Sequence, residues 1–214
     1  YTAVTPERVV FFGADVHNTE AVAYVLSFSL LVVSIVVPLI SGIADYYHLK
    51  RRFMQFFCYL GAASCCSLYW FDPEHLEVSF ISVTLASIGF WSSIVFYNAY
   101  LPEVAFPKDQ DRVSAKGFIL GYLGSVILLI INLGMILKPE LLGITSGAAS
   151  QISFVMVGLW WLGFAQITFR RLPNNIFDKK PEKDYIWKGF KELKIVGNEI
   201  KNYPTLKRFL YAFF

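Results

Sequence analysis

Five long stretches of this chain contain no charged residue and no histidine. They are 21–44, 53–71, 78–101, 117–137 and 141–169, and the shortest of them has 19 residues. A helix needs about 20 apolar residues to cross a hydrocarbon core of about 30 Å. Each stretch is therefore predicted to be a membrane-spanning helix, the last one over about 148–169. The alternation over ~10 residues that is typical of barrel strands is absent.

The composition supports a membrane protein. Charged residues make up 16% of the 214 residues, and the mean hydropathy is +0.50. Soluble domains carry about 25% charged residues, so this chain has too few to cover a water-facing surface. A soluble enzyme is therefore disfavoured. Residues 1–20 contain Glu7, Arg8 and Asp15 and no apolar core, which argues against a signal peptide and predicts an extracytoplasmic lead.

Lysine and arginine are distributed unevenly between the predicted loops. Seventeen of the 19 basic residues fall in three alternate segments, and only Arg8 and Lys138 fall in the others. Cytoplasmic loops hold the excess of basic residues. The segments 46–52, 102–116 and 170–208 are therefore predicted to be cytoplasmic, in a multi-pass protein of the cell inner membrane.

The segment 170–205 is predicted to be a cytoplasmic connector. Apolar residues recur in it at helical spacing with lysines between them, which predicts a basic amphipathic helix. Such a helix would lie on the inner membrane surface or against the ends of the other helices; a calmodulin-type or nucleic-acid target is the alternative. The chain becomes apolar again from Phe209 to Phe214, and residues 206–214 are predicted to start another membrane helix. We therefore expect the chain to be part of a longer protein.

The loop after the first span carries Asp45 followed by Lys50, Arg51 and Arg52. An acidic residue at a helix exit, then a short turn and a cationic cluster, resembles the signature loop between helices 2 and 3 of the major facilitator superfamily. Three positions depart from that pattern: Ser41 and His48 stand where it has glycine, and Tyr46 where it has a basic residue.

Three further strings are similar to the vacuole-effluxer branch of that superfamily, which includes an autophagy-linked amino-acid permease of yeast and many bacterial transporters. They begin at Ile88, Val95 and Asp111, and read IGFW, VFYNAYLPE and DRVSAKGFILGYLGS. The resemblance implies an all-α membrane protein with a major facilitator type helical bundle of twelve helices. This chain would hold helices 2–6 and the start of helix 7, without helix 1 and the C-terminal half.

Polar side chains form stripes on three of the predicted spans, of which the first has serines at every seventh residue of 21–44, namely Ser27, Ser34 and Ser41. Thr84, Ser87, Trp91 and Asn98 fall on one face of the 78–101 helix, and Tyr122 begins a similar stripe with Ser125 and Asn132 on the 117–137 helix. Polar groups in lipid turn toward the protein interior or toward water. Thr84, Ser87, Trp91, Asn98 and Tyr122 are candidates for substrate contact, and polar contact between helices is the alternative.

Two other sets of residues are candidates for conformational roles. Gly117, Gly121 and Gly124 lie on one face of the 117–137 helix, where small residues allow close packing or sliding of a neighbouring helix. Asp45, Lys50, Arg51, Arg52 and Arg112 lie at the predicted cytoplasmic surface. Charge pairs between these loops could hold one conformation, or the basic residues could only anchor the membrane surface.

The sequence predicts neither a cofactor nor a metal, and no nucleic-acid partner. No titratable carboxylate, lysine, arginine or histidine lies within a span, and the three cysteines lack histidine or cysteine partners at zinc spacing. The favoured function is secondary active transport of a small solute, an amino acid or related metabolite, by alternating access in contact with membrane lipid. A non-transporting receptor or assembly scaffold on the same helices is the alternative.

Overall fold

The computed structural model describes residues 7–11, 13–46, 49–71 and 76–172, together with short pieces between 194 and 208. Apart from those pieces, the predicted connector helix and the predicted start of the next span lie outside the described residues. The long helices are α1 (Asn18–Tyr46), α2 (Lys50–Ser67), α3 (Leu76–Asn98), α5 (Gln110–Leu137) and α6 (Ser146–Arg171). Shorter elements are η1 (Leu68–Trp70), α4 (Leu101–Val104), η2 (Pro107–Asp109) and η3 (Pro139–Leu142).

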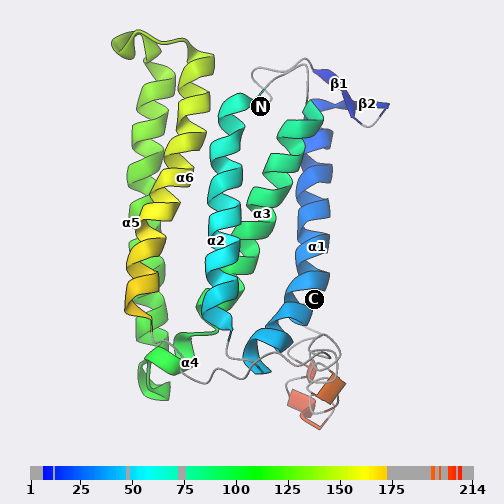
Figure 1. The fold of residues 1–214 in the computed structure, drawn as a ribbon, viewed down its shortest axis with the longest axis vertical. Helices are drawn as coiled ribbons and strands as arrows, with labels where there is room; N and C mark the ends of the chain where they lie inside the picture. Colours follow the sequence, from blue (N-terminus) through cyan, green and yellow to red (C-terminus); the bar gives the residue numbers. More distant parts are fainter. Residues whose placement is uncertain are drawn as a thin grey trace.

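The five long helices lie side by side in the order α5, α6, α2, α3, α1 (Figure 1). α2 packs against both α3 and α6, while α1 packs against α3 and α5 against α6. One cluster of buried apolar side chains joins α1, α2, α3 and α6, with Phe57 of α2 and Phe96 of α3 at its centre. Their rings stack at a centroid distance of 6.0 Å. The helical fold predicted from the sequence is confirmed.

Within the described residues, four segments are long and apolar enough to cross a membrane: Asn18–Ala44, Leu76–Val104, Pro107–Leu137 and Ser146–Arg171. α2 is not apolar enough to be counted with them, because its 18 residues begin with Lys50, Arg51 and Arg52. The span predicted at 53–71 corresponds to the rest of α2 together with η1. α2 is the helix in the middle of the row, so its neighbours supply much of its apolar contact.

The five long helices begin before the predicted spans, although α2 and α3 also end earlier, at Ser67 and Asn98. α5 begins at Gln110 rather than near 117, and it takes Asp111, Arg112 and Lys116 into its first turns. The sequence boundaries followed the loss of charge, which marks where lipid begins. A helix continues past that point because its backbone hydrogen bonds do not depend on lipid.

A β-hairpin precedes α1, and the sequence did not predict it. β1 (Arg8–Phe11) pairs antiparallel with β2 (Ala14–His17), and Gly13 has a positive φ of 83° that suits the reversal. Val9 is buried in a second cluster with Ala21, Val25, Leu76 and Phe80. The hairpin therefore packs onto the first turns of α1 and α3 (Figure 1).

The row of helices has two distinct ends. The end where α1 ends, α2 begins and α4 lies is called the basic end, because it carries Lys50, Arg51, Arg52, Lys108, Arg112, Lys116, Arg170 and Arg171. The opposite end, with the hairpin and the α5–α6 connection, is called the hairpin end (Figure 1). The described parts of all three predicted cytoplasmic segments thus lie at the basic end.

Candidate functional site

The polar stripe of α3 holds four of the predicted substrate-contacting residues. Trp91 is 44% exposed and Asn98 is also exposed, while Thr84 and Ser87 are half-buried. Within the described part of the chain, none of these four side chains makes a hydrogen bond. By contrast, Ser82 and Ser93 of the same helix donate to carbonyl oxygens one turn earlier. The stripe therefore keeps hydrogen-bonding capacity that Ser82 and Ser93 have already used, and so does Ser92 of the same helix, whose buried hydroxyl has no partner in the described structure.

Tyr122, the fifth predicted substrate residue, lies on α5 and is 70% exposed. Its neighbour Ser125 donates at 3.0 Å to the carbonyl oxygen of Gly121, within the same helix. Leu128 is the one residue of α5 that is buried in the described structure. α5 therefore presents most of its surface outward, and the structure brings Tyr122 into no contact with the stripe of α3.

The three glycines of α5 have different surroundings. A Cβ at Gly117 would lie 3.0 Å from the hydroxyl oxygen of Tyr97 on α3, and one at Gly124 would lie 3.8 Å from Nε1 of Trp160 on α6. A Cβ at Gly121 would have no neighbour within 4 Å. α5 thus approaches α3 at the basic end and α6 nearer its middle.

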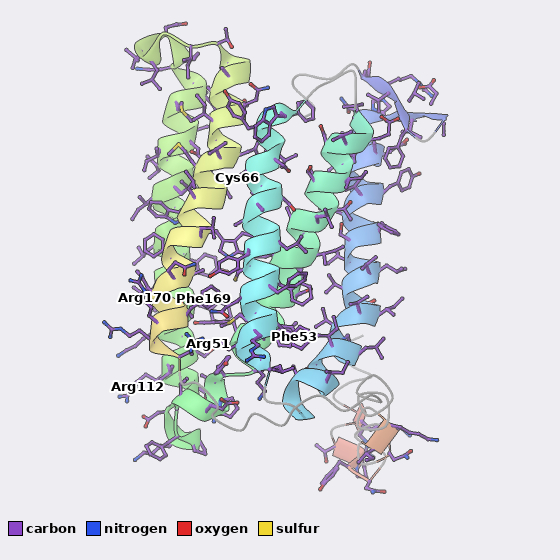
Figure 2. The ribbon with its side chains drawn as sticks, in the orientation of Figure 1. Arg51, Phe53, Cys66, Arg112, Phe169 and Arg170 are labelled. Carbon is purple, nitrogen blue, oxygen red and sulfur yellow. The ribbon has the colours of Figure 1, made fainter. Side chains whose placement is uncertain are left out.

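Two basic residues at the start of α2 connect it to other elements. Lys50 Nζ lies 2.9 Å from Oε1 of Glu103 in α4, and the two side chains are only 18% and 26% exposed. The guanidinium of Arg51 donates to the carbonyl oxygen of Phe169 in the last turn of α6 (Figure 2). Carbonyl groups at a helix C-terminus lack partners within the helix and attract cations. We call Lys50, Arg51, Glu103 and Phe169 the clasp.

The other predicted charge-pair residues are placed differently. Arg112 pairs with Asp109 at 2.9 Å, three residues earlier, and is 70% exposed. Arg112 thus makes a local contact rather than a link between helices. Asp45 lies in the last turn of α1, but its side chain is outside the described residues, and Arg52 is exposed with a partner of its own. Glu103, the acidic member of the clasp, was not predicted, because 53 residues separate it from Lys50.

Three glycines that the sequence analysis did not single out mark the closest helix contacts. A Cβ at Gly89 of α3 would lie 2.6 Å from Cα of Gly61 on α2, and one at Gly158 of α6 would lie 2.7 Å from the carbonyl oxygen of Ala62. Gly61 itself lies under the indole of Trp161. We call Gly61, Gly89 and Gly158 the glycine seam. It fixes the distances of α3 and α6 from the central helix α2, and sequence spacing alone could not reveal it.

No metal centre is found among the residues that the structure describes. They include no group of three or more histidine, cysteine or acidic side chains placed to hold an ion. Cys58, Cys65 and Cys66 are free thiols on α2.

Comparison with known proteins identifies the family. The sequence profile described as "Vacuole effluxer Atg22 like" matches residues 2–214. The chain therefore belongs to the Atg22-like vacuole effluxer family and is a multi-pass membrane protein of a transporter family rather than of an enzyme family. The family resemblance predicted from the sequence is confirmed.

Individual relatives agree with this assignment. The chain is 34% identical over 199 residues to the uncharacterized MFS-type transporter YxiO of Bacillus subtilis, covering 92% of this chain and 46% of that protein. It is 20% identical to autophagy-related protein 22-1 of Penicillium rubens, covering 85% of this chain and 41% of that protein. For autophagy-related protein 22 of Yarrowia lipolytica the identity is 22%, over 73% of this chain and 36% of that protein.

The chain spans less than half the length of these relatives. No solved structure matches it significantly.

Proposed function

We propose that this chain is part of a secondary active transporter that moves a small solute, an amino acid or related metabolite, by alternating access. The observation that carries the proposal, together with the family, is the polar stripe of α3. Its four side chains have no hydrogen-bond partner in the described structure and lie on a helix that is apolar enough to cross a membrane. A polar group without a partner in lipid is costly. A water-filled solute pathway would remove that cost.

The clasp supports a conformational role in the same proposal. It joins the start of α2 to α4 and to the end of α6, so these elements would move together when the basic end opens or closes. Bundle halves that move as rigid bodies around a central site are the usual basis of alternating access. The clasp would therefore preserve the internal structure of this half during the motion.

We also propose that the basic end faces the cytoplasm, as the excess of lysine and arginine there favours. A cysteine introduced at Asp109, in η2 at the basic end, should resist a membrane-impermeant maleimide in intact cells. A cysteine at Glu140, in η3 at the hairpin end, should react with it. The opposite labelling pattern would reverse the orientation.

The test of transport uses the full-length protein in liposomes and a panel of radiolabelled amino acids and related metabolites. Trp91→Ala and Asn98→Ala should each lower the initial uptake rate about tenfold or more, because each removes a group proposed to contact the solute. Ser125→Ala is the matched control, since its hydroxyl is already bonded within α5, and it should transport at the unaltered rate.

Unaltered transport by both stripe variants would show that the stripe does not contact the solute. A folded protein that moves no member of the panel would favour the receptor or scaffold alternative.

A further inference from the structure

A cavity of about 530 Å³ lies at the hairpin end between α1 and α3. Phe11 of the hairpin, Tyr24 and Phe28 of α1, and Glu77, Phe80 and Thr84 of α3 line it, together with three aliphatic side chains. Its volume falls within the range of about 300–1,000 Å³ that is usual for small-molecule sites. Three separate elements contribute to it, so the cavity depends on the tertiary fold.

The wall of the cavity combines aromatic rings with a single carboxylate. Phe80 is buried, and its ring meets that of Phe11 edge to face at a centroid distance of 5.2 Å. Of the described residues that line the cavity, Glu77 alone is charged, and it lies in the first turn of α3, at the hairpin end. Within the described structure its carboxylate has neither an ion pair nor a hydrogen bond.

Depth separates the polar and apolar parts of the cavity. Thr84 lies seven residues after Glu77 on α3, which corresponds to about 10 Å along the helix axis. Phe28 and Leu85 lie at that deeper level, while Glu77 marks the end nearer the water. A ligand that fits both parts therefore has a charged head and an apolar tail.

The charges around the cavity indicate whether the ligand's head is cationic or anionic. No lysine or arginine is found among the described residues that line the cavity. The described charged residues of the hairpin and of the start of α1, Glu7, Arg8, Asp15 and Glu20, carry more negative than positive charge. Aromatic rings attract ammonium groups through their negative faces. An anionic head would meet the carboxylate of Glu77, with no compensating cation among the described residues of the lining.

We infer that this cavity binds an amphipathic ammonium compound, with its cationic head beside Glu77 and its apolar tail toward Phe28 and Leu85. The inference goes beyond the proposed transport, because it concerns equilibrium binding at the hairpin end, where the cavity shares only Thr84 with the stripe. An ammonium group occurs in soluble alkylamines and also in phosphatidylethanolamine, whose headgroup carries a phosphate as well. The ammonium group is the chemistry that the two sources share.

The test measures binding of hexyltrimethylammonium to the full-length protein in phosphatidylglycerol nanodiscs by isothermal titration calorimetry, with empty nanodiscs subtracted. Saturable binding is expected, and hexanol and hexanoate should show none. Glu77→Gln should raise the dissociation constant about tenfold. Glu140→Gln is the matched control, because it removes an exposed carboxylate at the same end of the protein, and it should change the constant less than about twofold.

A second variant tests the aromatic wall of the cavity. Phe80→Leu keeps an apolar side chain but removes the ring, so it should weaken binding about 3- to 30-fold, the size of a cation–π contact. Phosphatidylethanolamine added to the nanodiscs distinguishes the sources. If the dissociation constant of hexyltrimethylammonium rises as the fraction of phosphatidylethanolamine increases, the lipid headgroup competes for the cavity and is its ligand. If the constant does not change, the ligand is a soluble amine. Absence of saturable binding, equal affinity in Glu77→Gln, or equally tight binding of hexanol would overturn the inference.

Discussion

Adding one methyl group at Gly89 is expected to force α2 and α3 apart. The added Cβ would lie 2.6 Å from Cα and N of Gly61 and 2.7 Å from the carbonyl oxygen of Phe57. All three atoms belong to the backbone of α2 and cannot turn aside. Carbon atoms pack best at about 3.5–4.0 Å, so the helices must separate by about 1 Å.

The cost follows from that displacement. A gap of about 0.5–1 Å removes about a quarter to a half of the dispersion energy of the contacts across it, and overpacked cores typically lose about 1–3 kcal/mol. α2 contacts α3 along much of its length. Gly89→Ala should therefore lower the free energy of unfolding by about 3 kcal/mol, near the upper limit of that range.

Gly134→Ala provides the matched control. A Cβ at Gly134 on α5 would meet nothing within 4 Å, and alanine is the better helix former by about 0.5–1 kcal/mol. The assay heats the full-length protein in detergent and measures the monodisperse fraction by size-exclusion chromatography. Gly89→Ala should lower the midpoint temperature by about 5 °C or more, while Gly134→Ala should leave it equal or slightly higher. Equal midpoints for the two variants would refute the close approach of α2 and α3.

Two further predictions concern the ends of helices. Lys50→Ala and Glu103→Ala should each lower stability by about 1 kcal/mol, because the ion pair is largely shielded from water. A double-mutant cycle should give a coupling energy of about 0.5–1 kcal/mol between the two residues. Strictly additive effects would show that the ion pair contributes nothing. Thr145→Ala should cost about 1 kcal/mol, because the Thr145 hydroxyl accepts a hydrogen bond from the backbone N–H of Ala148 at the start of α6. The same thermal assay measures it, with Ser150→Ala as control, and equal stability of these two variants would contradict the cap.

The apolar stretches predicted the long helices well, because lipid imposes a length and a composition that the sequence must display. The first and last uncharged residues did not mark the helix ends, because a helix can continue into water. α5, for example, begins at Gln110 and not near residue 117. The hairpin was missed because its two strands have four residues each, and one pair of short strands leaves only a weak alternation beside the charges of residues 7–20.

The contacts between helices were less predictable than the helices themselves. Lys50 was identified as a candidate, but its partner Glu103 is fixed by the packing of α2 against α3 and α4, which no local pattern encodes. The glycine seam was missed for the same reason, since a glycine reveals its purpose only when the opposing backbone is in place. The stripe of α3 was visible because helical periodicity is local, whereas its relation to Tyr122 on α5 depends on the tertiary fold.

The most direct test of the proposed function measures access to the stripe from each side of the membrane. Cysteines are placed singly at Thr84 and at Asn98 in full-length protein whose Cys58, Cys65 and Cys66 are replaced by alanine. Alternating access predicts that a transported solute changes their reactivity toward an impermeant maleimide in opposite directions, since Thr84 lies nearer the hairpin end and Asn98 nearer the basic end. Alternating access would be contradicted if, with every transported solute, the reactivities of the two cysteines stayed constant or changed in the same direction.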